Sequence, residues 1–272
     1  MTMAANPLYE IRGLICSYGE APVLLIDRLD ILPGGPTAFI GHNGSGKSTL
    51  LKALAFLLKP LSGTIRFLGG DTEGMERELR REATLLLQDP YLLRRSVFEN
   101  IAYGLRARGD TCSLRDRVAE ALEMVGLPPD FAKREWFQLS GGESRRVAIA
   151  SRLVLRTKVL LLDEPTANVD EENALLIADG VKNAWSKGGT VPIVASHDLQ
   201  WLEGLCARRI TLRRGKIESP APGGDDHPPA ASPGFVRKPG FRPCALKDRE
   251  HPSFRPRRRG LWAGFSKEFQ IL

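Results

Sequence analysis

A glycine-rich run near the amino terminus has the residue types that bind nucleotide phosphates. Residues 41–48 read Gly-His-Asn-Gly-Ser-Gly-Lys-Ser, which fits the pattern GxxxxGK[ST] in full. Glycines allow backbone N–H groups to converge on phosphate oxygens, and a helix that starts there adds its positive end. Lys47 can reach the β- and γ-phosphates, and the Ser48 hydroxyl can ligate Mg²⁺. The run predicts a nucleoside triphosphate site at Gly41, His42, Asn43, Gly44, Ser45, Gly46, Lys47, Ser48 and Thr49.

Two adjacent carboxylates, Asp163 and Glu164, follow an apolar run at residues 159–162. A buried parallel strand presents its functional groups at its carboxyl end, so we expect both acids to lie beside the glycine-rich loop. Asp163 would hold Mg²⁺ through its water shell, and Glu164 would polarise the attacking water. A kinase or a GTPase could supply the first acid, but the second favours hydrolysis. The alternative is an ordinary strand end with two solvated acids.

The elements that must position these motifs alternate between strands and helices. A short strand at 37–40 leads into the glycine-rich loop, and a helix is predicted at 47–58. Buried strands are predicted at 159–162 and 191–195. β-forming residues bounded by Gly and Pro predict antiparallel strands at 8–14, 23–31 and 64–68. Helical periodicity predicts helices at 97–108, 114–125 and 143–155. The fold class is therefore α/β, with a parallel sheet core, an antiparallel β subdomain and an inserted helical subdomain at about 91–157.

Residues 219–272 differ in composition from residues 1–218, which form one domain without repeats. The tail holds nine of the 19 prolines and ten basic residues against five acidic ones. Such a composition is typical of disorder, with a short ordered piece expected at 261–272. The tail is either a basic arm for anionic lipid or a partner, or a dispensable extension, and we favour the second interpretation.

Charge and hydropathy exclude several classes of protein. The net charge is +7, but the tail contributes +5, so residues 1–218 carry an excess of only two positive charges. This balance argues against a nucleic-acid-binding surface on the domain. The longest apolar run, at 53–58, is far below the roughly 18 residues of a membrane span. The four cysteines lie far apart, which indicates free thiols in a reducing compartment.

A third motif, Leu139-Ser140-Gly141-Gly142-Glu143, precedes a stretch rich in Arg and small residues. Taken alone, it is a loop in which Ser140 caps a helix. Between the glycine-rich loop and the acid pair, it resembles the signature of the ATP-binding cassette (ABC) transporter family. The resemblance covers residues 8–218 and implies the P-loop NTPase fold of the ABC ATPases. It also implies hydrolysis of ATP with Mg²⁺ and a head-to-tail homodimer, in which the signature closes over the partner's nucleotide.

The resemblance extends to other positions. Gln88 is similar to the glutamine that contacts Mg²⁺ or water and senses the membrane partner. His197 is similar to the histidine that contacts the γ-phosphate, so Glu164, His197 and Gln88 form the expected catalytic set. Ser48, Gln88 and Asp163 form the expected Mg²⁺ set. Asn168 and Asp170 match the loop that crosses the dimer interface, and Tyr18 resembles the aromatic residue that stacks on adenine.

Two residues depart from the family pattern. Asn168 stands where serine is commoner. Pro192 falls inside the strand that leads to His197, where proline is excluded unless a ladder hydrogen bond is missing. Since Glu164 and His197 are both present, the sequence gives no sign of an inactive ATPase.

The short cassette is similar to the ATPases of tungstate, molybdate and phosphate importers, with tungstate favoured. The implied partners are transmembrane permease subunits and, indirectly, a substrate-binding protein, at the cytoplasmic face of the inner or plasma membrane. Residues 91–95 are predicted to line a groove for a permease helix, so Leu93→Asp should uncouple the complex. One alternative is a soluble ABC ATPase that acts on nucleic acid or the ribosome. Another is a regulatory subunit that binds ATP without hydrolysing it.

Overall fold

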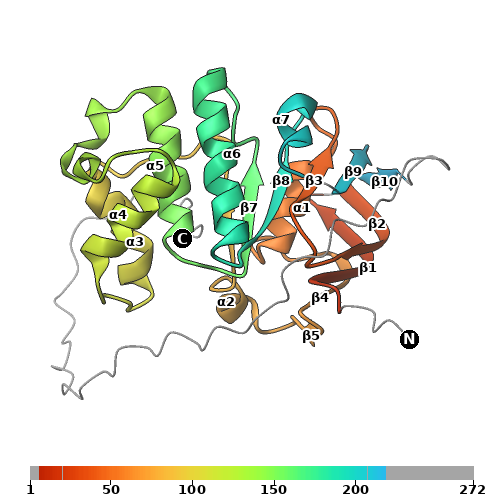
Figure 1. Ribbon diagram of the computed structural model, residues 1–272. Coiled ribbons are helices and arrows are strands. Elements are labelled where there is room, and N and C mark those ends of the chain that lie inside the picture. Colours follow the sequence, from red (N-terminus) through yellow and green to blue (C-terminus); the bar gives the residue numbers. More distant parts are fainter. Residues whose placement is uncertain (1–5, 20, 207, 219–272) are drawn as a thin grey trace, which may run out of the picture.

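Two β-sheets and their covering helices form the structure, a computed structural model that describes residues 6–19, 21–206 and 208–218 (Figure 1). The first sheet is antiparallel, with strand order β2-β1-β4-β5. Its strands are β1 (Tyr9–Ser17), β2 (Pro22–Ile31), β4 (Ser62–Phe67) and β5 (Gly70–Asp71). The predictions for residues 219–272, including the ordered piece at 261–272, lie outside the described residues.

The second sheet has the order β10-β9-β3-β8-β7-β6 and is parallel except for the pairing of β10 with β9. Its strands are β3 (Thr37–Ile40), β6 (Ala83–Leu86), β7 (Val159–Asp163), β8 (Val191–Ala195), β9 (Arg208–Arg213) and β10 (Lys216–Glu218). The mixed α/β fold with a parallel and an antiparallel sheet is confirmed. Strands β6, β9 and β10 were not predicted from the sequence.

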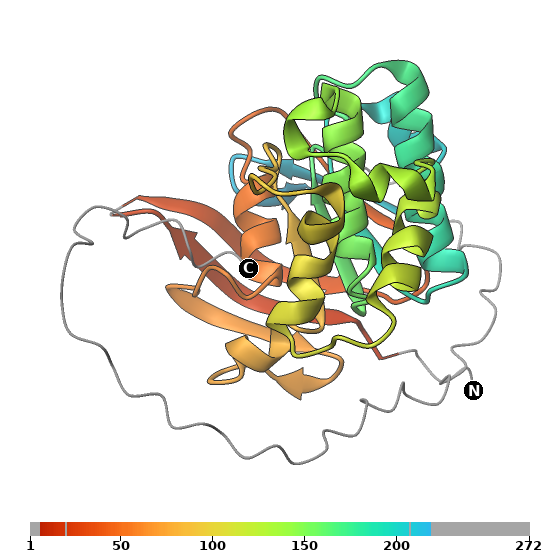
Figure 2. The ribbon, with the colours of Figure 1, turned by 90° about the vertical axis from the view of Figure 1, so that its left-hand side faces the viewer.

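Helices cover the parallel sheet and connect its strands. They are α1 (Lys47–Leu54), α2 (Glu76–Leu79), α3 (Val97–Ala107), α4 (Leu114–Met124), α5 (Gly141–Leu153), α6 (Glu171–Ser186) and α7 (Leu199–Glu203), with short 3-10 turns at Pro129–Lys133 and Trp136–Gln138. Figure 1 shows α3, α4 and α5, yellow to green, on the side away from the red and orange antiparallel sheet, and in Figure 2 these helices face the viewer. No helix in the described ranges is long and apolar enough to cross a membrane.

The residues of β7 show how the sheet separates two cores. Successive side chains of a strand point to opposite faces, so an apolar strand can be buried on both. Leu160 and Leu162 belong to the core shared with α3–α7, whereas Val159 and Leu161 belong to the core shared with α1 and the antiparallel sheet. Consequently α1 and α5 pack on opposite faces of the parallel sheet.

Pro192 lies inside β8, yet the missing N–H removes no ladder bond. The N–H of Val191 points to β7, because it donates to the Lys158 carbonyl at 2.8 Å. Alternation then turns the nitrogen of Pro192 toward β3. The register of β3 with β8 begins only at the next residue, where Thr37 pairs with Ile193. Proline is therefore tolerated in the middle of this sheet, and the predicted strand at 191–195 is confirmed.

The predicted helix at 47–58 was wrong at its carboxyl end, because α1 stops at Leu54. Phe56 has a left-handed backbone, with φ of 58°, which no α-helix continues. Its ring packs against Tyr9 and Phe67 of the antiparallel sheet, at centroid distances of 6.3 and 5.7 Å. Tertiary packing thus ends the helix where sequence periodicity continues it.

Candidate nucleotide site

The register of the parallel strands brings the predicted motifs to one edge of the sheet. Phe39 of β3 and Asp163 of β7 both pair with Ala195 of β8, and Leu86 of β6 pairs with Leu162. The loops after these residues therefore leave the sheet at the same, carboxyl end. They carry Gly41–Gly46, Glu164, His197 and Gln88.

Two glycines of the phosphate-binding loop are required by close packing. At Gly41, with φ of 155°, a Cβ would lie 2.2 Å from the carbonyl oxygen of Leu212. At Gly46, with φ of 104°, it would lie 2.7 Å from Cδ2 of Leu24. Gly46 is the N-cap of α1, and no described side chain caps this helix. The first N–H groups of α1 are therefore available to an anion.

Lys47 is held inside the loop by oxygens. Its side chain is only 6% exposed, and Nζ lies 3.4 Å from Oε1 of Glu164. Nζ also donates to the carbonyl of Gly41 at 2.7 Å and to that of His42 at 3.4 Å. The hydroxyl of Ser45 is buried and has no hydrogen-bond partner among the described residues. The loop thus contains a buried cation and an unsatisfied hydroxyl, both suited to phosphate oxygens.

The carboxylate of Glu164 pairs with Lys47 through Oε1 and joins its own loop to the loop after β8 through Oε2. Its Oε2 accepts hydrogen bonds from the Ser196 hydroxyl at 3.1 Å and from the backbone N–H of His197 at 3.4 Å, and it lies 2.9 Å from Nδ1 of His197. Glu164 is 5% exposed, whereas the imidazole of His197 is 63% exposed. The contact between the buried carboxylate and the solvent-facing imidazole can hold both side chains in place for a ligand bound at the sheet edge.

Asp163 has the properties of a ligand for a divalent cation. Burial raises the pKa of its carboxyl group, and a hydrogen bond from the Ser48 hydroxyl partly offsets the shift. Its Oδ1 is buried without a partner in the part of the chain that the structure describes. Carboxylate and hydroxyl oxygens suit Mg²⁺. No described group of three His, Cys, Asp or Glu side chains could hold a metal, so further ligands would come from a nucleotide and water.

Gln88 and Tyr18 lie at the rim of this arrangement. Gln88 is exposed two residues after β6. Tyr18 is 54% exposed, and Nζ of Lys52, on α1, lies 5.7 Å from its ring centroid. Tyr18 is therefore beside the helix that begins at the phosphate-binding loop.

The signature lies at the start of α5 and satisfies its own polar groups. The hydroxyl of Ser140 accepts from the N–H of Glu143 at 3.2 Å, and the Glu143 carboxylate accepts from the N–H of Ser140 at 2.8 Å. This capping box makes α5 begin two residues before the predicted helix. Ser140 and Gly141 are exposed. Because α5 and α1 pack on opposite faces of the sheet, the signature and the phosphate-binding loop of one copy belong to helices on different faces.

The predicted interface loop lies beside the signature. Asn168 has φ of 58°, and Asp170 caps α6 by accepting from the N–H of Asn173 at 2.8 Å. A Cβ on Gly142 would lie 2.9 Å from Cγ of Asn173. The starts of α5 and α6 are thus in contact, and the signature and the loop at 168–170 form one surface.

Two residues of the site were not found by sequence reasoning. Ser196 is fully buried and bonds Glu164. Its position next to His197 was a usable signal. Arg145 donates from Nη1 to the carbonyl of Glu164 at 3.0 Å. No spacing rule points to this contact.

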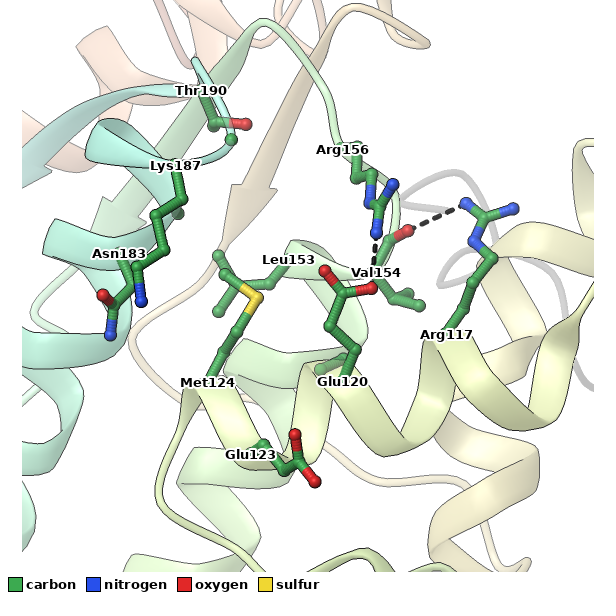
Figure 3. A pocket seen from close by; sticks show the side chains of 13 residues that line it. Arg117, Glu120, Glu123, Met124, Leu153, Val154, Arg156, Asn183, Lys187 and Thr190 are labelled. Carbon is green, nitrogen blue, oxygen red and sulfur yellow. Dashed lines mark hydrogen bonds and ion pairs between the residues drawn. The ribbon is translucent and has the colours of Figure 1, made fainter. Parts of the chain in front are cut away.

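A cavity of about 510 Å³ lies elsewhere, between α4, the end of α5 and the end of α6 (Figure 3). Arg156 and Thr190 line it and precede β7 and β8, so it is at the amino ends of these strands. Both of its arginines already have partners, since Arg156 pairs with Glu120 and Arg117 donates to the Val154 carbonyl. This cavity is separate from the edge that carries the motifs.

Comparison with known proteins connects this geometry to one family. Residues 26–167 match the ABC transporter family. The energy-coupling factor transporter ATP-binding protein EcfA2 of Caldanaerobacter subterraneus is 39% identical over 66% of this chain and 65% of its own length. The tungstate uptake system ATP-binding protein TupC of Peptoclostridium acidaminophilum is 34% identical over 76% of this chain and 95% of its own length. The chain therefore spans less than two thirds of EcfA2 and nearly all of TupC.

Solved structures with the same fold include assemblies. The cbiO1 protein of Clostridium perfringens, part of the ABC transporter complex cbiONQ, has a TM-score of 0.71 and 30% identity over 79% of this chain and 88% of its own. A bacterial ABC transporter cassette in dimeric form has a TM-score of 0.71 and 28% identity over 78% and 97%. A cassette in a post-hydrolysis state bound to ADP and Pi matches equally well. The chain therefore belongs to the ABC transporter family, as one of its ATP-binding cassettes, and so to the ABC ATPases.

Proposed function

We propose that this cassette hydrolyses Mg-ATP to power an importer. The observation that carries the proposal is the buried cluster at the sheet edge, where Lys47, Asp163 and Glu164 lie beside an uncapped helix start. Buried charges are costly unless a ligand or a partner compensates them. A triphosphate would accept hydrogen bonds from Lys47 and from the free N–H groups together. The solved relative with bound ADP and Pi supports hydrolysis as the reaction.

Each residue then has a role in the transfer of a phosphoryl group to water. Lys47 and the N–H groups of the loop bind the β- and γ-phosphates. Glu164 takes a proton from the water as its oxygen attacks the γ-phosphorus, while the bond from the γ-phosphorus to the β–γ bridging oxygen breaks and ADP leaves. His197, held by Oε2 of Glu164, faces the γ-phosphate. Bound Mg²⁺ would neutralise charge on the phosphate oxygens, held by Ser48 and Gln88 and, through water, by Asp163.

The second half of the site comes from another copy of the chain. The signature residues lie at the start of α5, on the face opposite α1, and would close over a partner's nucleotide. They are Leu139, Ser140, Gly141, Gly142 and Glu143. Their exposed N–H groups at a helix start suit the γ-phosphate. Asn168 and Asp170, beside the signature, would cross the same interface. The dimeric solved cassette supports this arrangement.

The permease would dock on the surface formed by residues 91–95 and the turn before the signature. Tyr91 is 94% exposed and Phe137 is 67% exposed. Arg94 lies over the ring of Trp136, with its guanidinium carbon 6.0 Å from the centroid. Exposed aromatic and basic side chains of this kind suit an amphipathic helix of a membrane subunit. This docking would hold the cassette at the cytoplasmic face of the membrane, with a substrate-binding protein acting indirectly.

The structure also identifies a better probe of docking than Leu93. The backbone of Leu93 is fixed by the side chain of Asn100, which accepts from the N–H at 2.7 Å and donates to the carbonyl at 3.0 Å. Because Tyr91 is almost fully exposed whereas Leu93 is half-buried, Tyr91→Asp should separate ATP turnover from transport with less disturbance of the fold than Leu93→Asp. Retained transport in the Tyr91→Asp variant would contradict the docking surface.

The proposed cargo is an oxyanion, with tungstate favoured, because the tungstate relative matches across nearly all of its own length. The cargo would pass through other subunits. Deletion of the gene should abolish uptake of one oxyanion, measured for tungstate, molybdate and phosphate in parallel. Unchanged uptake of all three would remove this part of the proposal. Steady-state release of phosphate by the purified chain, with Glu164→Gln as control, tests the ATPase activity itself.

A further inference from the structure

Two neighbouring arginines on α5 are buried but bind different parts of the molecule. Arg145 is 8% exposed and Arg146 is 9% exposed. Nη1 of Arg146 donates to the carbonyls of Val125 and Gly126, at 3.2 and 3.0 Å, in the turn after α4. Nη1 of Arg145 instead donates to the carbonyls of Glu164 and Pro165, at 3.0 and 3.5 Å. One arginine thus holds the helical layer together, and the other contacts the catalytic loop.

The surroundings of Arg145 join three functional segments. Burial lowers the pKa of its guanidinium group, and the carboxylate of Asp89 opposes this shift. Asp89 follows Gln88 in the loop after β6. Arg145 also lies four residues after Gly141 in the helix that begins at the signature. A single buried cation therefore lies among the signature helix, the Gln88 loop and the Glu164 loop.

The backbone that Arg145 contacts is under conformational strain. Glu164 has φ of 44°, a left-handed conformation that costs a non-glycine residue about 1 kcal/mol or more. Its N–H donates to the Ala195 carbonyl at 2.8 Å, and its carbonyl accepts from the N–H of Ala167 at 3.2 Å as well as from Arg145. Such a conformation persists only where neighbours hold it, and Arg145 is the contact that comes from α5.

We infer that Arg145 is a positioning residue that couples the signature helix to Glu164 of the same copy. The inference rests on the proposed function, in which the signature of one copy closes over the nucleotide of the other. A partner nucleotide that draws the start of α5 toward it would then also move the carbonyl of Glu164. Arg145 would in this way connect the two nucleotide sites of a dimer through a rigid helix and two hydrogen bonds.

The test compares Arg145→Gln with Arg146→Gln, a matched change on the same helix at equal burial. We expect Arg145→Gln to lower kcat about tenfold, the effect of a small misplacement of a catalytic group, with KM for ATP changed less than about twofold. Its Hill coefficient for ATP should fall toward one. Arg146→Gln should lose comparable thermal stability but keep the kcat and the Hill coefficient of the unmodified chain.

A third variant keeps the test decisive if Arg145→Gln folds poorly. Arg145→Lys retains the charge and one donor, so its kcat should lie between those of the unmodified chain and Arg145→Gln. Equal kcat for the Arg145 and Arg146 variants, or losses of kcat that follow thermal stability alone, would overturn the inference. An unmodified chain without ATP turnover would instead contradict the proposed function.

Discussion

The edge of the parallel sheet and the start of α5 both offer N–H groups to an anion, but they differ in how complete they are. At the sheet edge, Oδ1 of Asp163 and the hydroxyl of Ser45 are buried without partners in the described chain. At the start of α5, Ser140 and Glu143 satisfy each other in a capping box, and Gly141 is exposed. The first region needs a ligand to balance its buried polar groups, whereas the second is stable as it folds.

Because of this difference, substitutions in the two regions should have different effects on nucleotide binding. A change at the sheet edge should alter nucleotide binding or chemistry in a single copy, because the buried groups there act on the ligand directly. A change at the start of α5 should leave the single copy able to bind nucleotide and should appear only when two copies meet.

Lys47→Ala should have the largest effect. It removes a buried cation that would form charge-assisted hydrogen bonds to phosphate oxygens and leaves the Glu164 carboxylate without its ion pair. We expect the affinity for ATP to fall about 100-fold, from the loss of up to about 3 kcal/mol. Titration with a fluorescent ATP analogue measures this loss. Lys59→Ala, an exposed lysine beyond the same helix, is the control and should bind normally; equal affinity of the two variants would contradict the role of Lys47.

Glu164→Gln should affect chemistry and spare binding. The amide keeps the size of the carboxylate but cannot act as a base toward water, which lowers turnover by roughly 100- to 10,000-fold. ATP affinity should stay within about threefold, because the phosphate-binding loop is unchanged. Phosphate release and nucleotide titration on one preparation give both quantities. Turnover above about a tenth of normal would exclude Glu164 as the general base.

Ser140→Ala should have the smallest effect on a single copy. It removes the cap of α5 and should lower the free energy of unfolding by about 1 kcal/mol, without a change in nucleotide affinity of the monomer. Denaturant unfolding and nucleotide titration test the two statements. Ser140→Asn preserves a capping oxygen and should restore the stability. A loss of monomer affinity in Ser140→Ala would place the signature in the site of its own copy.

The sequence predicted the structure best in segments whose conformation depends on neighbouring residues in the chain. The strand at 37–40, the glycine-rich loop and the strand at 191–195 could be read from local patterns, since steric needs and burial act on neighbouring residues. Asp170 followed by two glutamates has the pattern of a helix start, so α6 could also have been predicted from the sequence. The family resemblance supplied the roles of Gln88 and His197, which no local pattern gives.

The contacts that depend on distant segments could not be predicted. Helix α1 ends early because Phe56 packs against two rings of another sheet. The bond from Arg145 to Glu164 crosses the boundary between helix and sheet, and its existence depends on how α5 is rotated on the parallel sheet. Pro192 was interpreted as a disturbance, and only the register of β3 with β8 explains why it is tolerated.

The most direct test of the two-copy site uses Gly141→Asp in the Glu164→Gln chain. Apart from its chain neighbours and the backbone of its own helix, no described atom lies within 4 Å of a Cβ at Gly141, so the single copy should fold normally. The added carboxylate would repel a γ-phosphate. Sedimentation velocity with ATP should show a dimer for Glu164→Gln and a monomer for the double variant, at equal nucleotide occupancy. A dimer in both samples, or a monomer in both, would contradict a nucleotide shared between the loop of one copy and the signature of the other.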